Sequence, residues 1–118
     1  MSQSENQGKR VGLAVELRPE LEERYRALHR DPWEAVLNRI TASGIRDYSI
    51  YLGRIGGRLI LFSHFVYVGD DFDADMRKIA ADAETQRWWK ETDPCQMRLD
   101  GTPEGEQWLP LEEVFHAS

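Results

Sequence analysis

The sequence predicts an α+β domain in which an antiparallel sheet carries helices on one face. Two kinds of pattern support this fold class. Apolar residues alternate with polar or small ones along 11–17 and 45–52, and a long apolar stretch rich in β-formers covers 59–68. Between these stretches, apolar residues recur at helical spacing. The resulting order, β-α-(α)-β-β-α-(α)-β, is the split β-α-β arrangement of ferredoxin-like domains.

The first part of the chain is expected to form a strand followed by two helices. The strand has one apolar face, made by Val11, Leu13, Val15 and Leu17. Pro19 suits the first turn of a helix. That helix should end near Arg30, because Pro32 disfavours helical geometry in the residue before it. A second helix is expected over 33–42, with Gly44 as its C-terminal stop.

The stretches 45–52 and 59–68 are expected to pair as a hairpin around the glycine-rich turn 53–57. Both faces of the second strand carry large apolar side chains. One face holds Ile60, Phe62, Val66 and Val68, and the other holds Leu59, Leu61, Phe65 and Tyr67. Helices on one side leave the other sheet face open. The pattern therefore predicts a second chain or a ligand there, and a homodimer with its sheets face to face is the simplest expectation.

The last part of the chain is expected to add two helices and a closing strand. One helix should cover 72–81, and a shorter one should start at Asp82 and break at Asp93-Pro94. Residues 95–108 are interpreted as a polar loop, and 110–116 as a short final strand. These elements complete the ferredoxin-like order.

Composition narrows the class of protein. We expect a polar, disordered N-terminal tail over 1–8 and a single domain over 9–118. The net charge of −6 and the pI near 5.0 disfavour nucleic acid and anionic membrane surfaces as partners. The single cysteine, Cys95, cannot form an internal disulfide, which suits the cytoplasm.

Tyr25 and His29 are the first candidates for chemistry. Residues four apart lie on one helix face, so a phenol and an imidazole would stand side by side. Because imidazole titrates near neutral pH, it can accept and return a proton in one cycle. The spacing alone is more typical of a polar surface contact, and only a pocket over the pair would make it an acid/base site.

Further candidates are aromatic. Trp88 and Trp89 are adjacent on a helix, so their rings point about 100° apart. One could pack inward while the other lines a cavity, although both could equally belong to a core or an interface. Tyr48, on the second strand, could reach a pocket or pair across the sheet. The spacing of the three histidines matches no metal motif, and no cofactor is expected.

Several segments together resemble the L-rhamnose mutarotase family over Arg10 to Phe115. The similar segments are Leu21-Glu22-Glu23-Arg24-Tyr25 to His29, Trp33, Gly44 to Leu52, Gln86-Arg87-Trp88-Trp89-Lys90, and Leu111 to Phe115. The combination of the tyrosine–histidine helix with the Gln-Arg-Trp-Trp-Lys run is specific, whereas either alone would be weak. In one place the chain departs from the family, because Pro32 precedes Trp33 where the family usually has Trp-Pro-Glu.

The resemblance implies a sugar mutarotase that interconverts the α and β anomers of a 6-deoxyhexose, and it makes L-rhamnose the first candidate substrate. It implies that His29 is the acid/base residue and that Tyr25, Tyr48, Trp88 and Trp89 bind the sugar. It also implies a dimeric α/β barrel, no cofactor and a cytoplasmic role in deoxysugar catabolism. Three alternatives stay open: a mutarotase for L-fucose or another sugar, a non-catalytic sugar-binding dimer, and a cofactor-free oxygenase of the same topology.

Overall fold

The computed structural model describes residues 8–118, so all but the last residue of the expected N-terminal tail lies outside the described residues. Its sheet is antiparallel, and its long strands are β1 (Lys9–Leu17), β2 (Ile45–Ile55) and β3 (Arg58–Tyr67). The strand order is β2-β3-β1-β4, and β5 also pairs with β1. This order confirms the predicted ferredoxin-like arrangement.

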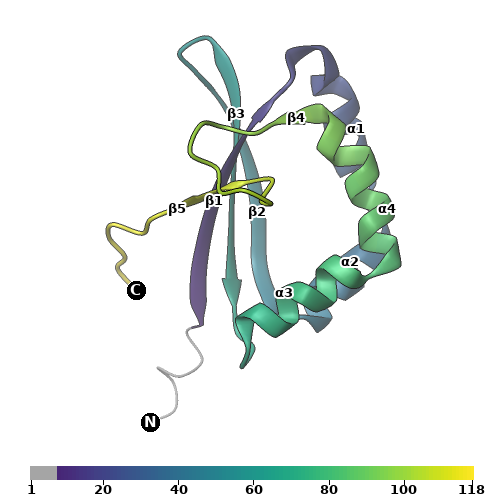
Figure 1. Ribbon diagram of the computed structural model, residues 1–118, viewed down its shortest axis with the longest axis vertical. Helices are drawn as coiled ribbons and strands as arrows, with labels where there is room; N and C mark the ends of the chain where they lie inside the picture. Colours follow the sequence, from purple (N-terminus) through teal and green to yellow (C-terminus); the bar gives the residue numbers. More distant parts are fainter. Residues whose placement is uncertain (1–7) are drawn as a thin grey trace.

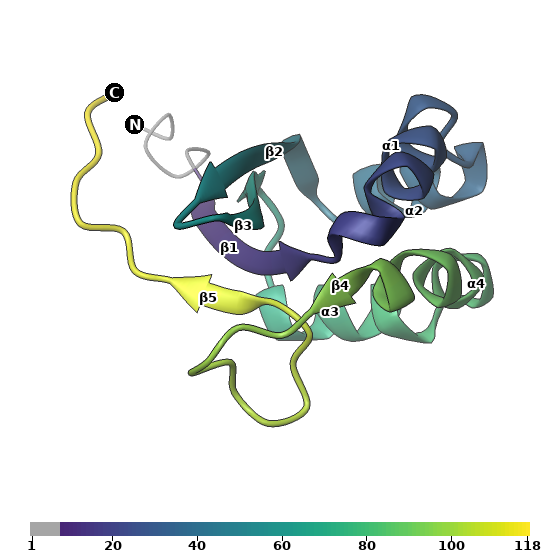
Figure 2. The ribbon, with the colours of Figure 1, turned by 90° about the horizontal axis from the view of Figure 1, so that it is seen from above.

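Four helices cover one face of the curled sheet (Figures 1 and 2). They are α1 (Glu22–Arg30), α2 (Glu34–Ala42), α3 (Phe72–Ala81) and α4 (Ala83–Thr92). Short 3₁₀ turns, η2 (Pro19–Leu21) and η3 (Asp93–Cys95), precede α1 and follow α4. Aspartate side chains start the last two helices, since Asp71 accepts a hydrogen bond from the amide of Ala74 and Asp82 accepts one from Thr85.

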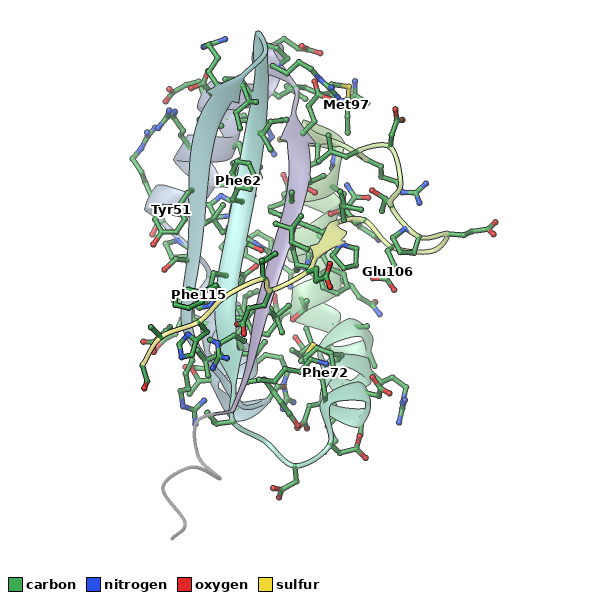
Figure 3. The ribbon with its side chains drawn as sticks, turned by 90° about the vertical axis from the view of Figure 1, so that its left-hand side faces the viewer. Tyr51, Phe62, Phe72, Met97, Glu106 and Phe115 are labelled. Atoms are coloured by element: carbon green, nitrogen blue, oxygen red, sulfur yellow. The ribbon has the colours of Figure 1, made fainter. Side chains whose placement is uncertain are left out.

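The core lies between the sheet and the helices, in two clusters. One is centred on β1 and α1 and contains Val15, Leu17, Tyr25, Leu59, Leu61 and Cys95. The other lies towards α3 and contains Ile45, Phe65, Tyr67 and Ile79. The alternate positions of β1 and β3 therefore face the helices as the sequence pattern predicts. The opposite sheet face carries the labelled Tyr51 and Phe62 and is not covered by a helix (Figure 3).

The expected turn at 53–57 is too long. β2 continues to Ile55, which pairs with Arg58, so Gly56 and Gly57 alone form the turn. Both have positive φ, 59° and 79°, as a two-residue hairpin turn of the primed type requires. Gly53 is a strand residue opposite Ile60, and it misled the prediction because glycine often marks turns.

The expected final strand over 110–116 is also wrong. The edge of β1 is covered in two pieces, by β4 (Gln96–Met97) opposite Glu16–Leu17 and by β5 (Leu109–Leu111) opposite Gly12–Ala14. Residues 98–108 bulge out between the two pieces. After Leu111 the chain leaves β1 (Figure 2), so the apolar residues beyond it have no neighbouring strand to pair with.

Candidate functional site

A cavity of about 370 Å³ lies between α1 and the sheet. Its polar wall is one face of α1, and its apolar wall is the helix-facing side of the sheet. The lining residues are Tyr25, Arg26, His29 and Arg30 from α1, and Leu17, Ile50, Leu52 and Leu61 from β1, β2 and β3. The volume is in the range of small-molecule sites, roughly 300–1,000 Å³. The structure thus places a pocket over the tyrosine–histidine pair.

The rings of Tyr25 and His29 stack, with centroids 4.3 Å apart and planes inclined by 32°. His29 Nδ1 lies 2.9 Å from the backbone carbonyl oxygen of Tyr25. A carbonyl oxygen can only accept a hydrogen bond, so Nδ1 must carry the proton in this contact. In the neutral ring the lone pair is then on Nε2. The helix itself therefore selects the tautomer in which Nε2 can act as a base.

Aromatic packing fixes the other side of the His29 ring. Trp88 of α4 meets it edge to face at a centroid distance of 5.2 Å. Trp88 in turn meets Trp33 at 5.2 Å, just before α2 begins. The order Pro32-Trp33, which departs from the family pattern, thus still delivers a tryptophan to this cluster. The sequence had given Trp33 no site role.

Tyr25 is buried, and its hydroxyl has one identified partner. Gln96 Nε2 of β4 donates to Tyr25 Oη at 3.4 Å, and Gln107 Nε2 donates to Gln96 Oε1 at 3.0 Å. Burial raises the pKa of Tyr25 strongly, so the phenol remains protonated through the neutral range. Both glutamines fall within the stretch that the sequence predicts to be a polar loop. No periodicity or motif marks them, and sequence reasoning missed them.

Tyr48 faces the helices because of a bulge in β2. The register of β2 against β3 shifts between Arg46 and Ser49, and Asp47 has a φ of 52°. This extra residue places both Ile45 and Tyr48 on the helix-facing side, where Tyr48 contacts Phe65 edge to face at 5.6 Å.

Tyr48 is partly exposed at this position. Its exposed fraction is 44%, and the protein around the phenol raises its pKa. Tyr48 is not among the residues that line the His29 cavity.

Trp89 is not brought to the His29 cavity. It is 38% exposed and lines a second, wider hollow beside Arg18, Lys90 and Asp93. The adjacent tryptophans thus diverge, as helical geometry predicts, with Trp88 inward and Trp89 outward. Gln96 and Gln107 also border this second hollow.

Within residues 8–118, no group of three or more histidine, cysteine, aspartate or glutamate side chains could hold a metal ion. None of the described helices is long and apolar enough to cross a membrane. The titratable groups of the cavity are therefore the imidazole and phenol described above, with two arginines at its rim. Both arginines are paired with acids of α1, Arg26 with Glu22 and Arg30 with Glu23.

Comparison with known proteins adds independent information. A family model described as L-rhamnose mutarotase matches residues 10–117. A Bacillus subtilis protein named L-rhamnose mutarotase is 33% identical over 95 residues, which cover 80% of this chain and 84% of that protein. A Phocaeicola vulgatus protein of the same name is 30% identical over 109 residues, covering 92% and 97%.

The fold is also similar to that of a solved structure. The crystal structure of an L-rhamnose mutarotase from Formosa agariphila superposes with a TM-score of 0.70. The match covers 94% of this chain and 100% of that one, at 21% sequence identity. At 21% identity, this similarity shows that the two proteins share a fold.

Proposed function

Because the chain belongs to the L-rhamnose mutarotase family, we propose that it is an isomerase that interconverts the α and β anomers of L-rhamnose, with His29 as the acid/base residue. The observation that carries this proposal is the hydrogen bond from His29 Nδ1 to the Tyr25 carbonyl, 2.9 Å long, inside a cavity of sugar size. It leaves Nε2 as the ring's free base.

The chemistry needs one proton to move between two oxygens of the same sugar. Nε2 takes the proton of the O1 hydroxyl, the C1–O5 bond breaks, and C1 and O1 become the aldehyde carbonyl. The imidazolium delivers the proton to O5, which becomes a hydroxyl. After rotation about C1–C2, the reverse steps close the ring on the other carbonyl face. Positioned proton transfer of this kind contributes about 10² to 10⁴ in rate.

The walls of the cavity suit a 6-deoxyhexose. Such a sugar has hydroxyls over most of its ring and one methyl group in place of a hydroxymethyl. The partly buried Ile50 and Leu52, beside the fully buried Leu17 and Leu61, form an apolar wall for that methyl group, opposite the polar face of α1. A hydroxymethyl group against these apolar side chains would lose its hydrogen bonds to water, which costs free energy.

We assign the tyrosines to hydroxyl recognition. Tyr25 lines the cavity, and Tyr48 lies on the same side of the sheet, against Phe65. Trp88 contacts the His29 ring edge to face. The sugar-binding roles that the resemblance gives to Trp88 and Trp89 both stay predictions, and Trp89 lines the second hollow. A cytoplasmic location likewise stays part of the proposal.

The direct test is NMR measurement of anomer exchange in L-rhamnose at neutral pH. Saturation of one anomeric proton should transfer to the other faster with the protein than in buffer. L-Fucose, which is also a 6-deoxyhexose, tests the selectivity. The proposal fails if no 6-deoxyhexose exchanges faster than in buffer, and binding without exchange would instead indicate a sugar-binding protein.

The partner we propose for the open sheet face is a second copy of the chain. Tyr51 is 63% exposed there beside Phe62, and the C-terminal stretch 112–118 passes in front of this face (Figure 3). Val114 and Phe115 of that stretch are 90% and 82% exposed. Apolar groups left in water on two adjacent surfaces favour burial against another chain.

Sedimentation equilibrium tests the dimer. The parent should have twice the mass of the chain, and Phe62→Glu should shift it to the monomer because it places a charge in the apolar interface. Leu37→Glu is the matched control, since Leu37 is also exposed, at 46%, but lies on α2. A monomeric parent, or an equal shift by both variants, would contradict the proposed interface.

A further inference from the structure

Gln96 connects the edge of the sheet to the phenol of the cavity. Its backbone is fixed by pairing with Leu17 of β1, and its side chain is buried. The amide nitrogen lies 3.4 Å from Tyr25 Oη, and the amide oxygen lies 3.0 Å from Gln107 Nε2. These contacts join α1, β4 and the segment before β5 in one chain of hydrogen bonds.

The chain of hydrogen bonds has a defined direction. A side-chain amide both donates and accepts, and Gln107 donates to the oxygen of Gln96. The nitrogen of Gln96 is thereby turned towards Tyr25 as a donor. Tyr25 Oη must accept this bond, so its own proton points elsewhere. The cavity that Tyr25 lines is the space where that proton can meet an acceptor.

We propose that Gln96, held by Gln107, is a positioning residue that directs the Tyr25 hydroxyl proton to an oxygen of the bound sugar. This inference rests on the proposed function, because it gives Tyr25 the role of a hydrogen-bond donor to the substrate. The amide acts through the phenol and does not touch the sugar. Burial of Tyr25 keeps the phenol protonated, which a donor requires.

The series of hydrogen bonds from Gln107 through Gln96 to Tyr25, here called the relay, lies between two hollows. Gln96 and Gln107 border the second hollow, whereas Tyr25 borders the first. The two amides thus form part of the wall between them. Gln86 borders the same second hollow, but its amide donates to the carbonyl of Ala80. It offers a control that changes the hollow without changing the relay.

A double-mutant cycle on anomer exchange tests the proposal. Gln96→Met should lower kcat/KM about tenfold in the parent, the usual effect of one lost hydrogen bond. In a Tyr25→Phe background the same substitution should have no further effect, because no hydroxyl remains to be directed. Gln86→Met should leave both rates unchanged. An equal loss from Gln96→Met in both backgrounds, or no loss in either, would overturn the proposal.

Gln96→Glu gives a second signature that a structural role would not produce. An ionised carboxylate only accepts, so Tyr25 would donate to it and be lost to the sugar. Protonation of the carboxyl at lower pH restores a donor. The activity of Gln96→Glu relative to the parent should therefore rise on acidification. A ratio that is independent of pH would contradict the inference.

One readout does not depend on activity and separates the two proposals. In protein labelled with ¹³C at the tyrosine Cζ, the Tyr25 signal is assigned by its absence in Tyr25→Phe. That signal should move in Gln96→Met and stay in place in Gln86→Met. If it moves in a protein that exchanges no anomers, the hydrogen bond exists but the proposed function fails. If it does not move, the relay is wrong.

Discussion

His29 Nδ1 and the backbone carbonyl oxygen of Tyr25 are 2.9 Å apart, one helical turn from each other. This contact fixes the tautomer of the His29 ring, because the carbonyl oxygen accepts a hydrogen bond from Nδ1–H. The remaining nitrogen is the basic one, and edge contact with Trp88 holds the ring in place. A residue four positions before a histidine can thus prepare it for proton transfer through its backbone alone.

The two tryptophans of α4 should respond differently to substitution. Trp88→Phe should lower kcat and the free energy of unfolding, because the smaller phenyl ring loses part of the edge contacts with both His29 and Trp33. Edge contacts between aromatic rings are worth about 0.5–1.5 kcal/mol beyond area burial. Trp89→Phe is the matched control and should leave kcat unchanged, since Trp89 faces the second hollow. Steady-state kinetics and urea unfolding measure both. Equal losses of kcat would instead support the sugar-binding role for Trp89 that the resemblance implies.

Tyr25 should make the native protein sensitive to strong alkali. Its pKa is raised in the folded state, first by burial. The unfolded chain therefore releases the phenolic proton at lower pH than the native protein does, so stability falls as pH rises above the ordinary value of about 10. Tyr25→Phe should show a smaller loss of stability over that range. The free energy of unfolding of both proteins is measured by urea unfolding between pH 8 and 11, in steps of about one pH unit. An identical pH dependence in both proteins would contradict it.

Asp82 should contribute to stability in the opposite pH range. Its carboxylate caps α4 by accepting from the amide and the hydroxyl of Thr85, and these bonds lower its pKa. The stabilisation is present above the unfolded value of about 3.9 and is lost as pH falls through the lower folded value. Asp82→Asn should keep the cap and lose this pH dependence, whereas Asp82→Ala should lose both. Thermal unfolding at several pH values tests this, and an unchanged acid response in Asp82→Asn would contradict it.

Replacing Ser63 with alanine should not destabilise the protein. Its hydroxyl is buried and has no hydrogen-bond partner among residues 8–118, which costs about 1–3 kcal/mol. Ser63→Ala should therefore leave the free energy of unfolding unchanged or higher. Ser43→Ala is the control, because Ser43 is equally buried but accepts a hydrogen bond from Arg39 Nε at 3.1 Å, and its loss should destabilise. Urea unfolding measures both, and the account of Ser63 is wrong if the two variants lose equal stability.

Local patterns predicted the parts of the molecule that local forces determine. The bounds of α3 follow from Asp71 as a cap and from an apolar face at helical spacing. The pairing of Tyr25 with His29 follows from the pitch of a helix. The bulge at Asp47 was not predictable from alternation, because it depends on how β2 meets β3. It reverses the side to which the later residues of β2 point.

The role of Gln96 depends on tertiary contacts as well. It lies 71 positions from Tyr25 in the chain, and no local pattern connects them. The ending of β5 at Leu111 has the same origin, since a strand needs a neighbour and the chain departs from β1 there. Residues that position a site through contacts distant in the sequence cannot be identified from local patterns in a single sequence.

We propose that the free Nε2 of His29 transfers the proton between O1 and O5 of the sugar. The decisive measurement is NMR anomer exchange in L-rhamnose with the parent, His29→Ala and His116→Ala. His116 is a control because it lies in the exposed C-terminal stretch, away from the cavity. We predict that His29→Ala lowers the catalysed rate by about 10² to 10⁴, the range for positioned proton transfer, and that His116→Ala keeps the parent rate. A His29→Ala protein that exchanges anomers at the parent rate would contradict the claim.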